Sequence, residues 1–247
     1  MPAEPLKLVQ FHTTSDIPNY SPFCVKAEVL LKMSGLPYEV ETLDDPRKTP
    51  KGKLPVLRDG DKVIADSEFI QRYLVSEKGV NFDSHLSERE KAQAHAFGKM
   101  IDERTYWALV YDRWVNDKNW PTTRDFWFGD IPFPIKQLVG SMVRKSVSKA
   151  SKGHGIGKHS HEEIYALAKS DFEAISNQLG DNDFLFGDKP STADAIAFGF
   201  LVNMVRGELT NQVHELMDEF PNLTAYVERG MERWFPELLA PAALAAE

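Results

Sequence analysis

The pattern of apolar residues changes near residue 85, and this change divides the chain into two parts. Before it, short apolar runs alternate with helical segments, beginning with a strand signal at residues 6–11. After it, segments with a helical period follow one another, at residues 87–115, 160–179, 192–211 and 223–234. We therefore predict a mixed α/β domain over residues 1–84 and an all-α domain over residues 85–247.

The first part begins with the signals of a strand, a helix and a second strand. Ser21 and Pro22 are typical of a helix start, because serine accepts a hydrogen bond from a free amide of the first turn and proline lacks that amide hydrogen. Gly35 ends the helix, and polar and apolar residues then alternate over residues 38–42. This order predicts a β-α-β arrangement.

Two further strands and a helix complete this part. Apolar runs at residues 54–57 and 63–65 flank Asp59 and Gly60, a pair that is typical of the turn in a β-hairpin. A helix signal follows over residues 68–77. The pattern predicts an antiparallel hairpin within a compact mixed sheet.

Composition and charge narrow the classes of function. Among the 247 residues, 42% are hydrophobic and 27% are charged, which is typical of a folded globular protein. The chain has 29 basic and 37 acidic residues, a net charge of −8, so there is no global field to attract a nucleic-acid backbone or an anionic lipid surface. We expect neither a nucleic acid nor a membrane among its partners.

Cysteine content and hydropathy indicate the compartment. Cys24 is the only cysteine, which excludes an intramolecular disulfide framework and favours a reducing compartment. The first residues show no pattern of a signal peptide. The most apolar window, residues 195–205, is shorter than the ~18 residues needed to span a bilayer. We therefore expect a cytoplasmic protein.

Pro55 occupies an unusual position, near the start of a strand that should lie inside the sheet. Proline cannot donate to a strand ladder. A cis bond between Leu54 and Pro55 would turn the main chain of Leu54 outward, where its N–H and C=O can pair with an extended peptide. Asp66 and Ser67, at the next helix start, offer a carboxylate for an ammonium group and donors for a carboxylate. The combination predicts a site for a small zwitterionic peptide.

These residues resemble the thioredoxin-like domain of the glutathione transferase superfamily, in which a proline-bearing strand, a hairpin turn and an acid–serine pair hold glutathione. The matching positions are Lys53, Leu54, Pro55, Asp66 and Ser67. The alternative is a purely structural role for each residue, in which Asp66 only caps a helix and Pro55 only ends a strand. The resemblance implies an α/β thioredoxin-like N-terminal domain plus an all-α C-terminal domain, with glutathione as co-substrate.

A second feature of this family is the sequence Tyr20-Ser21-Pro22-Phe23-Cys24. It resembles the Cys-Pro-Phe start of the first helix in cysteine-type members, with Ser21 in the cysteine position. A thiol with a pKa of ~8.5 is mostly protonated at neutral pH, and a helix N-terminus with a hydroxyl donor lowers that pKa. Ser21 is therefore the candidate catalytic residue, with Tyr20 as the alternative and helix capping as the structural interpretation. Phe23 is a candidate for substrate binding.

Cys24 lies at the second position of a Cys-x-x-Cys motif whose first cysteine is missing, which excludes a dithiol exchange cycle. We interpret it as a small buried hydrophobic residue. Mixed-disulfide chemistry in a glutathione-dependent reductase is the alternative.

Aromatic residues on the first long helix of the second part are candidates for a substrate pocket. Trp107, Tyr111 and Trp114 recur at intervals of four and three residues and so share a helix face, with Tyr106 adjacent. Packing in the core or at an interface is the alternative. In the domain arrangement of the family this helix borders the glutathione thiol, where its aromatic residues would bind a small hydrophobic electrophile. Secondary candidates in the following segment are Phe126, Trp127 and Phe128.

Two segments of the second part carry further resemblance. Residues 184–194 resemble the capping segment of the family's helical domain, where Ser191 or Thr192 and Asp194 cap a helix. Residues 155–164, together with residues 195–201, resemble the branch of the family that contains failed-axon-connections proteins, cadmium-responsive proteins and metaxins. Several members of that branch are adaptors or membrane-import components, so a non-catalytic protein with the same fold is an open alternative.

A basic segment extends over residues 144–161, with no acid before Glu162. One interpretation is that these basic residues bind a carboxylate or phosphate at the mouth of the glutathione site. The alternative is that they belong to a solvent-exposed connecting segment. His154, His159 and His161 lack a carboxylate or cysteine framework at ligand spacing, so no metal site is predicted.

The first hypothesis is therefore a glutathione transferase in which Ser21 stabilises the glutathione thiolate for attack on an apolar electrophile. The second is a binding or adaptor protein that keeps the fold without the chemistry, and the third is a reductase that uses Cys24. The resemblance also implies a homodimer.

Overall fold

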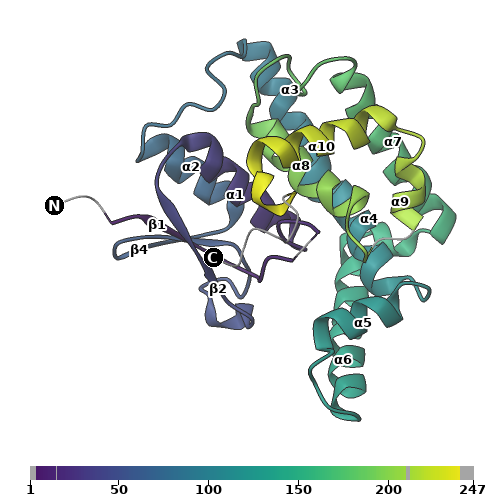
Figure 1. Cartoon of the computed structure of the whole chain (residues 1–247). Helices are drawn as coiled ribbons and strands as arrows, with labels where there is room; N and C mark the ends of the chain where they lie inside the picture. Colours follow the sequence, from purple (N-terminus) through teal and green to yellow (C-terminus); the bar gives the residue numbers. More distant parts are fainter. Residues whose placement is uncertain (1–3, 15, 210–211, 240–247) are drawn as a thin grey trace.

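A small sheet with two helices lies beside a larger group of helices (Figure 1). The computed structural model describes residues 4–14, 16–209 and 212–239. The strands all come from the first 65 residues, and every long element after residue 87 is a helix. The predicted fold class, an α/β part followed by an all-α part, is confirmed, whereas the domain boundary at residue 84 stays a prediction.

Four strands form one mixed sheet in the order β2-β1-β3-β4. β1 pairs in parallel with β2 and antiparallel with β3, and β3 pairs antiparallel with β4. The strands are β1 (Leu6–Gln10), β2 (Tyr38–Thr42), β3 (Val56–Asp59) and β4 (Lys62–Ala65). The hairpin is confirmed, but β3 begins at Val56 and not at residue 54, because ladder pairing starts only after Pro55, which has no amide hydrogen to donate.

Two helices, α1 (Pro22–Ser34) and α2 (Ser67–Ser76), pack against each other and belong to the same part. Both begin as predicted. The Ser21 side chain accepts a hydrogen bond from the Cys24 amide, and the Asp66 side chain accepts one from the Glu68 amide. α1 ends at Gly35, whose φ of 67° lies in the left-handed region that glycine adopts without a Cβ clash.

The second part consists of helices and short helical turns. Its helices are α3 (Glu88–Lys99), α4 (Tyr106–Val110), α5 (Trp120–Phe128), α6 (Ile135–His154), α7 (His161–Leu179), α8 (Thr192–Val205), α9 (Gln212–Met217) and α10 (Pro221–Trp234). Two π-helical turns, η2 (Met100–Thr105) and η3 (Tyr111–Val115), continue α3 and α4. These four elements follow one another without a gap, and we call residues 88–115 the long helix. Of the 3-10 turns, η1 (Pro46–Lys48) lies in the first part, and η4 (Ile156–Lys158) and η5 (Pro236–Leu238) lie in the second.

Some boundaries differ from the sequence prediction. The segment between the first two predicted helical segments, residues 116–159, contains two helices, α5 and α6. α8 ends at Val205, short of the predicted 211. Positions 210 and 211 lie outside the described residues.

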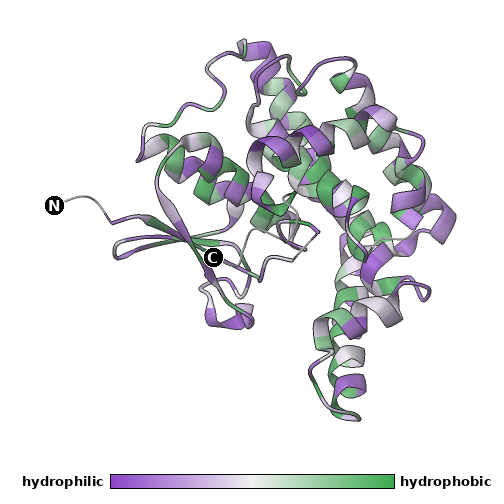
Figure 2. Ribbon diagram, in the orientation of Figure 1, coloured by the Kyte–Doolittle hydropathy of each residue, from purple (hydrophilic) through white to green (hydrophobic). Residues whose placement is uncertain are grey.

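The core lies where α8 packs along α1. Every residue of α8 from Ala193 to Val205 is buried, so this helix is surrounded by protein on all sides. Hydrophobic residues predominate along it (Figure 2). The two helices approach closely at Gly199, where a Cβ atom would lie 2.6 Å from the Pro22 carbonyl oxygen. None of the helices in the described ranges is long and apolar enough to cross a bilayer.

Candidate functional site

Two cavities adjoin the N-terminal end of α1. The Ser67 cavity has a volume of about 600 Å³, and its wall includes Lys53, Leu54, Asp66, Ser67, Glu68, Lys99, Asp102 and Trp107. The Trp114 cavity has a volume of about 530 Å³, and its wall includes Tyr20, Leu109, Arg113, Trp114, Trp127, Phe128, Val139 and Val143. Ser21, Phe23 and Tyr106 line both cavities. The two spaces therefore share a wall at the start of α1.

The main chain of Leu54 forms one edge of the Ser67 cavity. The Leu54–Pro55 bond is cis, as predicted. The Thr49 hydroxyl donates to the main-chain carbonyl of Lys53 and accepts from its amide. The Pro55 carbonyl accepts from the Asp66 amide at 3.3 Å. Within the described ranges, no hydrogen bond involves the Leu54 N–H or C=O. An extended peptide can therefore pair with one donor and one acceptor at this position.

Asp66 and Ser67 lie in the same cavity, as predicted. Asp66 is the one non-glycine residue of the described chain with a positive φ, 94°, a conformation that costs ~1–3 kcal/mol and is typical of binding sites. One oxygen of its carboxylate accepts from the Glu68 amide at 2.9 Å, and the other lies 3.8 Å from Lys51 Nζ. Ser67 is buried at the first turn of α2, where free amides attract an anion.

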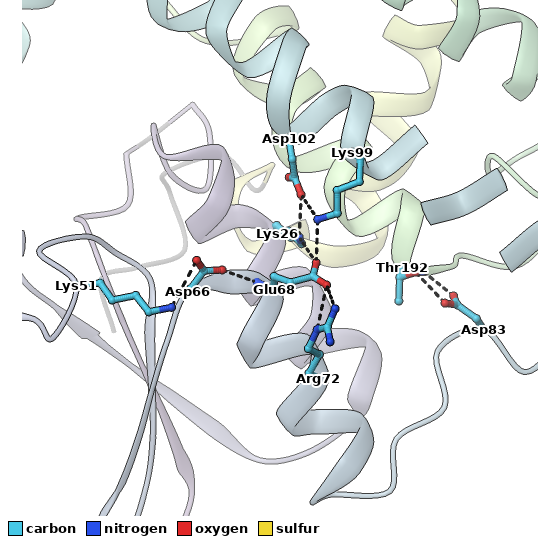
Figure 3. Close-up of polar contacts among 9 residues, drawn as sticks. All are labelled: Lys26, Lys51, Asp66, Glu68, Arg72, Asp83, Lys99, Asp102 and Thr192. Atoms are coloured by element: carbon cyan, nitrogen blue, oxygen red, sulfur yellow. Dashed lines mark hydrogen bonds and ion pairs between the residues drawn. The ribbon is translucent and has the colours of Figure 1, made fainter. Parts of the chain in front are cut away.

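A cluster of charged side chains from both parts of the chain lies beside these residues (Figure 3). Lys26 is completely buried, and its Nζ lies 3.8 Å from Glu68 and 3.7 Å from Asp102, beyond hydrogen-bond distance. Lys99 Nζ lies within 3.5 Å of the same two carboxylates. Burial lowers the pKa of Lys26, and the carboxylates of Asp102 and Glu68 oppose this effect. The cluster makes one end of the cavity strongly polar.

Sequence reasoning missed this cluster. The available signal was Lys26 itself, because it is a charged residue within a helix segment whose neighbours are nearly all apolar. The carboxylates that face it come from α2 and η2, which are far apart in the sequence. Only the packing of the two parts brings them together.

Ser21 is half-buried on the wall that the two cavities share. Its Oγ accepts a hydrogen bond from the Cys24 amide at 3.4 Å, so Ser21 caps the N-terminal end of α1. No acceptor among the described residues takes the Ser21 hydroxyl proton. The same side chain can therefore cap α1 and donate to a group in either cavity.

Of these two cavities, Tyr20 lines only the Trp114 cavity. Its ring packs edge-to-face on Phe126, with ring centroids 4.4 Å apart, and the Arg113 guanidinium lies 5.5 Å from the ring centroid. Burial raises the pKa of Tyr20, and a hydrogen bond from the Glu208 main chain counteracts this in part. Its phenol is thus engaged with the helical part of the protein.

Cys24 is completely buried among Val9, Leu54 and Val56. Burial raises the pKa of its thiol to about 12, so the thiol stays protonated near neutral pH. This environment is that of a small core residue.

The Trp114 cavity is mostly apolar, with aromatic rings on several sides. Trp114 stacks against Trp127 with ring centroids 6.2 Å apart. Tyr106 packs edge-to-face on Phe23 at 4.9 Å. Of the secondary candidates, Trp127 and Phe128 line this cavity. A small apolar molecule fits such a wall.

Trp107, Tyr111 and Trp114 do not line one cavity, so the structure does not bring these three predicted substrate-binding residues together. Trp107 lines the Ser67 cavity and stacks on His154 at 4.8 Å. Tyr111 lines neither cavity, and its hydroxyl lies 3.3 Å from His161 Nδ1. The π-helical turns η2 and η3 have more residues per turn than an α-helix, so the α-helical spacing does not hold along this segment.

Arg113 is a buried residue of the Trp114 cavity that sequence reasoning missed. Its Nη1 donates to the Tyr20 carbonyl at 2.8 Å and its Nη2 to Asn203 Oδ1 at 2.7 Å. Burial lowers its pKa to about 10, so the guanidinium keeps its charge at neutral pH. Arg113 therefore links the long helix to α8 and to the residue before Ser21.

The basic segment and the histidines do not extend the site. Arg144 donates to the carbonyls of Trp114 and Val115, at 3.0 and 2.7 Å, which is a structural role. The described part of the chain contains no group of three side chains that could hold a metal ion.

Comparison with known proteins identifies the family. A family model described as glutathione S-transferase N-terminal domain matches residues 22–119, and one described as glutathione S-transferase C-terminal domain matches residues 168–230. The isoprene-epoxide–glutathione S-transferase of Rhodococcus sp. (strain AD45) is 31% identical over 219 residues, which are 86% of this chain and 92% of that protein. The chain belongs to the glutathione S-transferase family.

Other relatives within the family belong to the branch that residues 155–164 resemble. Failed axon connections of Drosophila melanogaster is 30% identical over 249 residues, 93% of this chain but 58% of that protein. Metaxin-1 of Mus musculus is 29% identical over 214 residues, 83% of this chain and 67% of that protein. The glutathione S-transferase of Ceriporiopsis subvermispora in complex with glutathione shares the fold, with a TM-score of 0.65, 18% identity and coverage of 97% and 100% of the two chains.

The capping segment of the glutathione S-transferase family has the expected geometry here. Asp194 accepts from the Ser191 amide and hydroxyl, each at 2.8 Å. Thr192 instead donates through its amide and hydroxyl to Asp83, also at 2.8 Å (Figure 3). The segment therefore caps α8 and ties it to the connection that follows α2.

Proposed function

We propose that this member of the glutathione S-transferase family is an enzyme that joins the thiol of glutathione to a small hydrophobic electrophile. Glutathione occupies the Ser67 cavity, and the electrophile occupies the Trp114 cavity. The observation that carries this proposal is the position of Ser21, on the wall shared by both cavities and at the N-terminal end of α1.

The Ser67 cavity matches the groups of glutathione. The main chain of Leu54 pairs with the cysteinyl main chain of the peptide, and the Asp66 carboxylate takes the γ-glutamyl ammonium. The amide end of α2 at Ser67 takes the γ-glutamyl carboxylate. These pairings direct the sulfur toward the start of α1.

Ser21 then acts on the thiol. Its hydroxyl donates to the thiolate sulfur, and the positive end of the α1 dipole lowers the thiol pKa further. The thiol proton goes to solvent, and a sulfur lone pair forms the new S–C bond. The bond from that carbon to its leaving group, or to the ring oxygen of an epoxide, breaks with its electron pair. An alkoxide formed in this way takes a proton from water.

The wall of the Trp114 cavity favours a small apolar electrophile, because aromatic and aliphatic side chains make up most of it. The Rhodococcus relative is named for an epoxide of isoprene. We therefore place small apolar epoxides and halogenated hydrocarbons first among the substrates of this chain.

A second candidate function is a glutathione-binding protein without transferase activity. Ser21 already has a structural role, because its Oγ caps α1 through the Cys24 amide. The similarity to Failed axon connections and metaxin-1, neither of which is named as a transferase, also supports this candidate.

Turnover of a small epoxide by the wild type and by Ser21→Ala tests the proposal. We expect wild-type turnover, and we expect Ser21→Ala to lower kcat about 100-fold, because loss of one preorganised donor to a developing anion costs 10²–10³ in rate. Glutathione affinity, measured by calorimetry, should stay within about two-fold, since Ser21 contacts only the sulfur.

Tyr20→Phe and Cys24→Ala are the matched controls. Tyr20→Phe keeps the ring against Phe126 and should retain most activity. Full turnover by Ser21→Ala would refute its catalytic role. Glutathione binding without turnover across a panel of electrophiles would favour the binding protein, and reductase activity lost in Cys24→Ala would favour the reductase.

We also propose that the protein is a homodimer, as the family resemblance implies. Light scattering of the purified protein should give a mass of twice 28.0 kDa. A mass of one chain at micromolar concentration would contradict this.

A further inference from the structure

Helix α6 projects from the helical part, with its N-terminal end furthest from the body (Figure 1). Arg144, near the middle of α6, donates hydrogen bonds to the carbonyls of Trp114 and Val115, at the C-terminal end of the long helix 88–115. The first two turns of α6 therefore extend beyond the end of that helix. This end carries large apolar side chains in solvent. Their exposed fractions are 80% for Phe133, 55% for Ile135, 64% for Leu138 and 65% for Met142.

The same helix is strongly basic in an acidic chain. α6 contains five lysine and arginine residues and no acid, whereas the whole chain has a net charge of −8. Lys136 and Arg144 are engaged with Asp125 and Asp117. Three further lysines, Lys145, Lys149 and Lys152, are exposed on α6.

The apolar and basic residues follow one line along the helix. Ile135, Leu138 and Met142 are followed by Lys145, Lys149 and Lys152, at alternating intervals of three and four residues. Residues with this spacing share one side of an α-helix. The side chains that line the Trp114 cavity, Val139 and Val143, lie off this line. We call the set Phe133, Ile135, Leu138, Met142, Lys145, Lys149 and Lys152 the α6 stripe.

We propose that the α6 stripe binds the surface of a membrane that contains anionic phospholipids. The apolar end of the stripe enters the boundary between headgroups and acyl chains, and the lysines of the other end contact lipid phosphates. Because the apolar end is also the projecting end, an inclined α6 reaches below the phosphates while the body stays in water. This proposal does not depend on the proposed transferase activity.

The distribution of charge favours a lipid surface over a second copy of the chain. In a two-fold contact between two α6 stripes, the helices run either parallel, with lysines facing lysines, or antiparallel, with the lysines of one copy facing the apolar end of the other. Neither pairing compensates the positive charge. The net charge of −8, from which we expected no membrane partner, is a sum over the whole chain. It does not describe this local basic stripe.

Co-sedimentation with vesicles tests the proposal on the full chain. The probes are phosphatidylcholine vesicles with about 30 mol% phosphatidylserine and vesicles of phosphatidylcholine alone, each at low and at physiological salt. We expect binding to the anionic vesicles only, weakened by salt. Lys145→Gln with Lys149→Gln should lower the partition coefficient about 25-fold, since each lysine near the surface contributes about five-fold.

Leu138→Glu tests the apolar end, and we expect it to abolish binding. Val75→Glu is the matched control, because Val75 is also an exposed apolar residue on a helix but lies outside the stripe. Absence of binding to anionic vesicles at low salt, or equal binding by Leu138→Glu, would overturn the proposal. A dimer that Leu138→Glu converts to a monomer in light scattering would assign the stripe to a second copy and overturn it as well.

Discussion

The two cavities at the start of α1 are built in different ways. The Ser67 cavity takes its predicted binding groups from one short segment, residues 53–67, and two of those groups are main-chain atoms whose positions follow from a strand start and a helix start. The Trp114 cavity takes its wall from α1, the long helix, α5 and α6, and it depends on side chains. The comparison teaches that the proposed peptide site is built from local features of the chain, whereas the apolar cavity depends on how distant helices pack.

The largest effect is expected at the Ser67 cavity. Asp66→Asn keeps the helix cap and tolerates the positive φ, but it removes the charge that we propose binds the ammonium group of glutathione. We expect glutathione affinity to fall roughly 30-fold, which corresponds to loss of one charge-assisted hydrogen bond. Calorimetry measures this, with Asp61→Asn, an exposed acid of the hairpin turn, as the control. Unchanged affinity in Asp66→Asn would show that the main chain alone recognises the peptide.

The Trp114 cavity should respond in a separate way. Trp114→Ala removes a ring that stacks on Trp127, so the cavity holds a small electrophile less well. We expect kcat/KM for the electrophile to fall about ten-fold, with glutathione affinity unchanged. Phe133→Ala is the control, because Phe133 is an exposed aromatic residue that lines neither cavity. If glutathione affinity falls in parallel, the two cavities are not independent.

Alkaline pH should reveal the burial of Cys24, which lies beneath the Ser67 cavity wall at Leu54. Burial raises the pKa of its thiol from 9.0 to about 12, so only the unfolded state ionises between these values and stability falls as pH rises through this window. The wild type should lose about 1 kcal/mol more than Cys24→Ala between pH 8 and pH 10. Urea unfolding at both pH values measures the difference. An identical loss in the two proteins would mean that the thiol is accessible when folded.

The smallest effect is expected for Lys51→Ala. Lys51 Nζ lies 3.8 Å from Asp66, and both side chains are about half exposed, so solvent screens the pair. The free energy of unfolding should change by less than about 0.5 kcal/mol. Urea denaturation checks this value. A loss above 1 kcal/mol would indicate that Lys51 holds the unusual backbone of Asp66 in place.

Much of the first part could be predicted because its signals are local. The caps at Ser21 and Asp66, the glycine that ends α1 and the hairpin turn each need only a few adjacent residues. The cis bond before Pro55 followed from a conflict between a proline and its place in a sheet. The separation of Trp107, Tyr111 and Trp114 could not be predicted, because nothing in a spacing of four and three residues indicates a π-helical turn.

By itself, the amino-acid sequence determined the order of elements, the fold class and the segment that we propose to bind glutathione, since periodicity, caps and turns act over a few residues. The tertiary structure alone decided that Lys26 faces Glu68 and Asp102, that Arg113 joins Tyr20 to Asn203, and that Ser21 lies between two cavities. The physical reason is that each of these contacts joins residues from separate elements, and their proximity depends on how whole helices pack against one another.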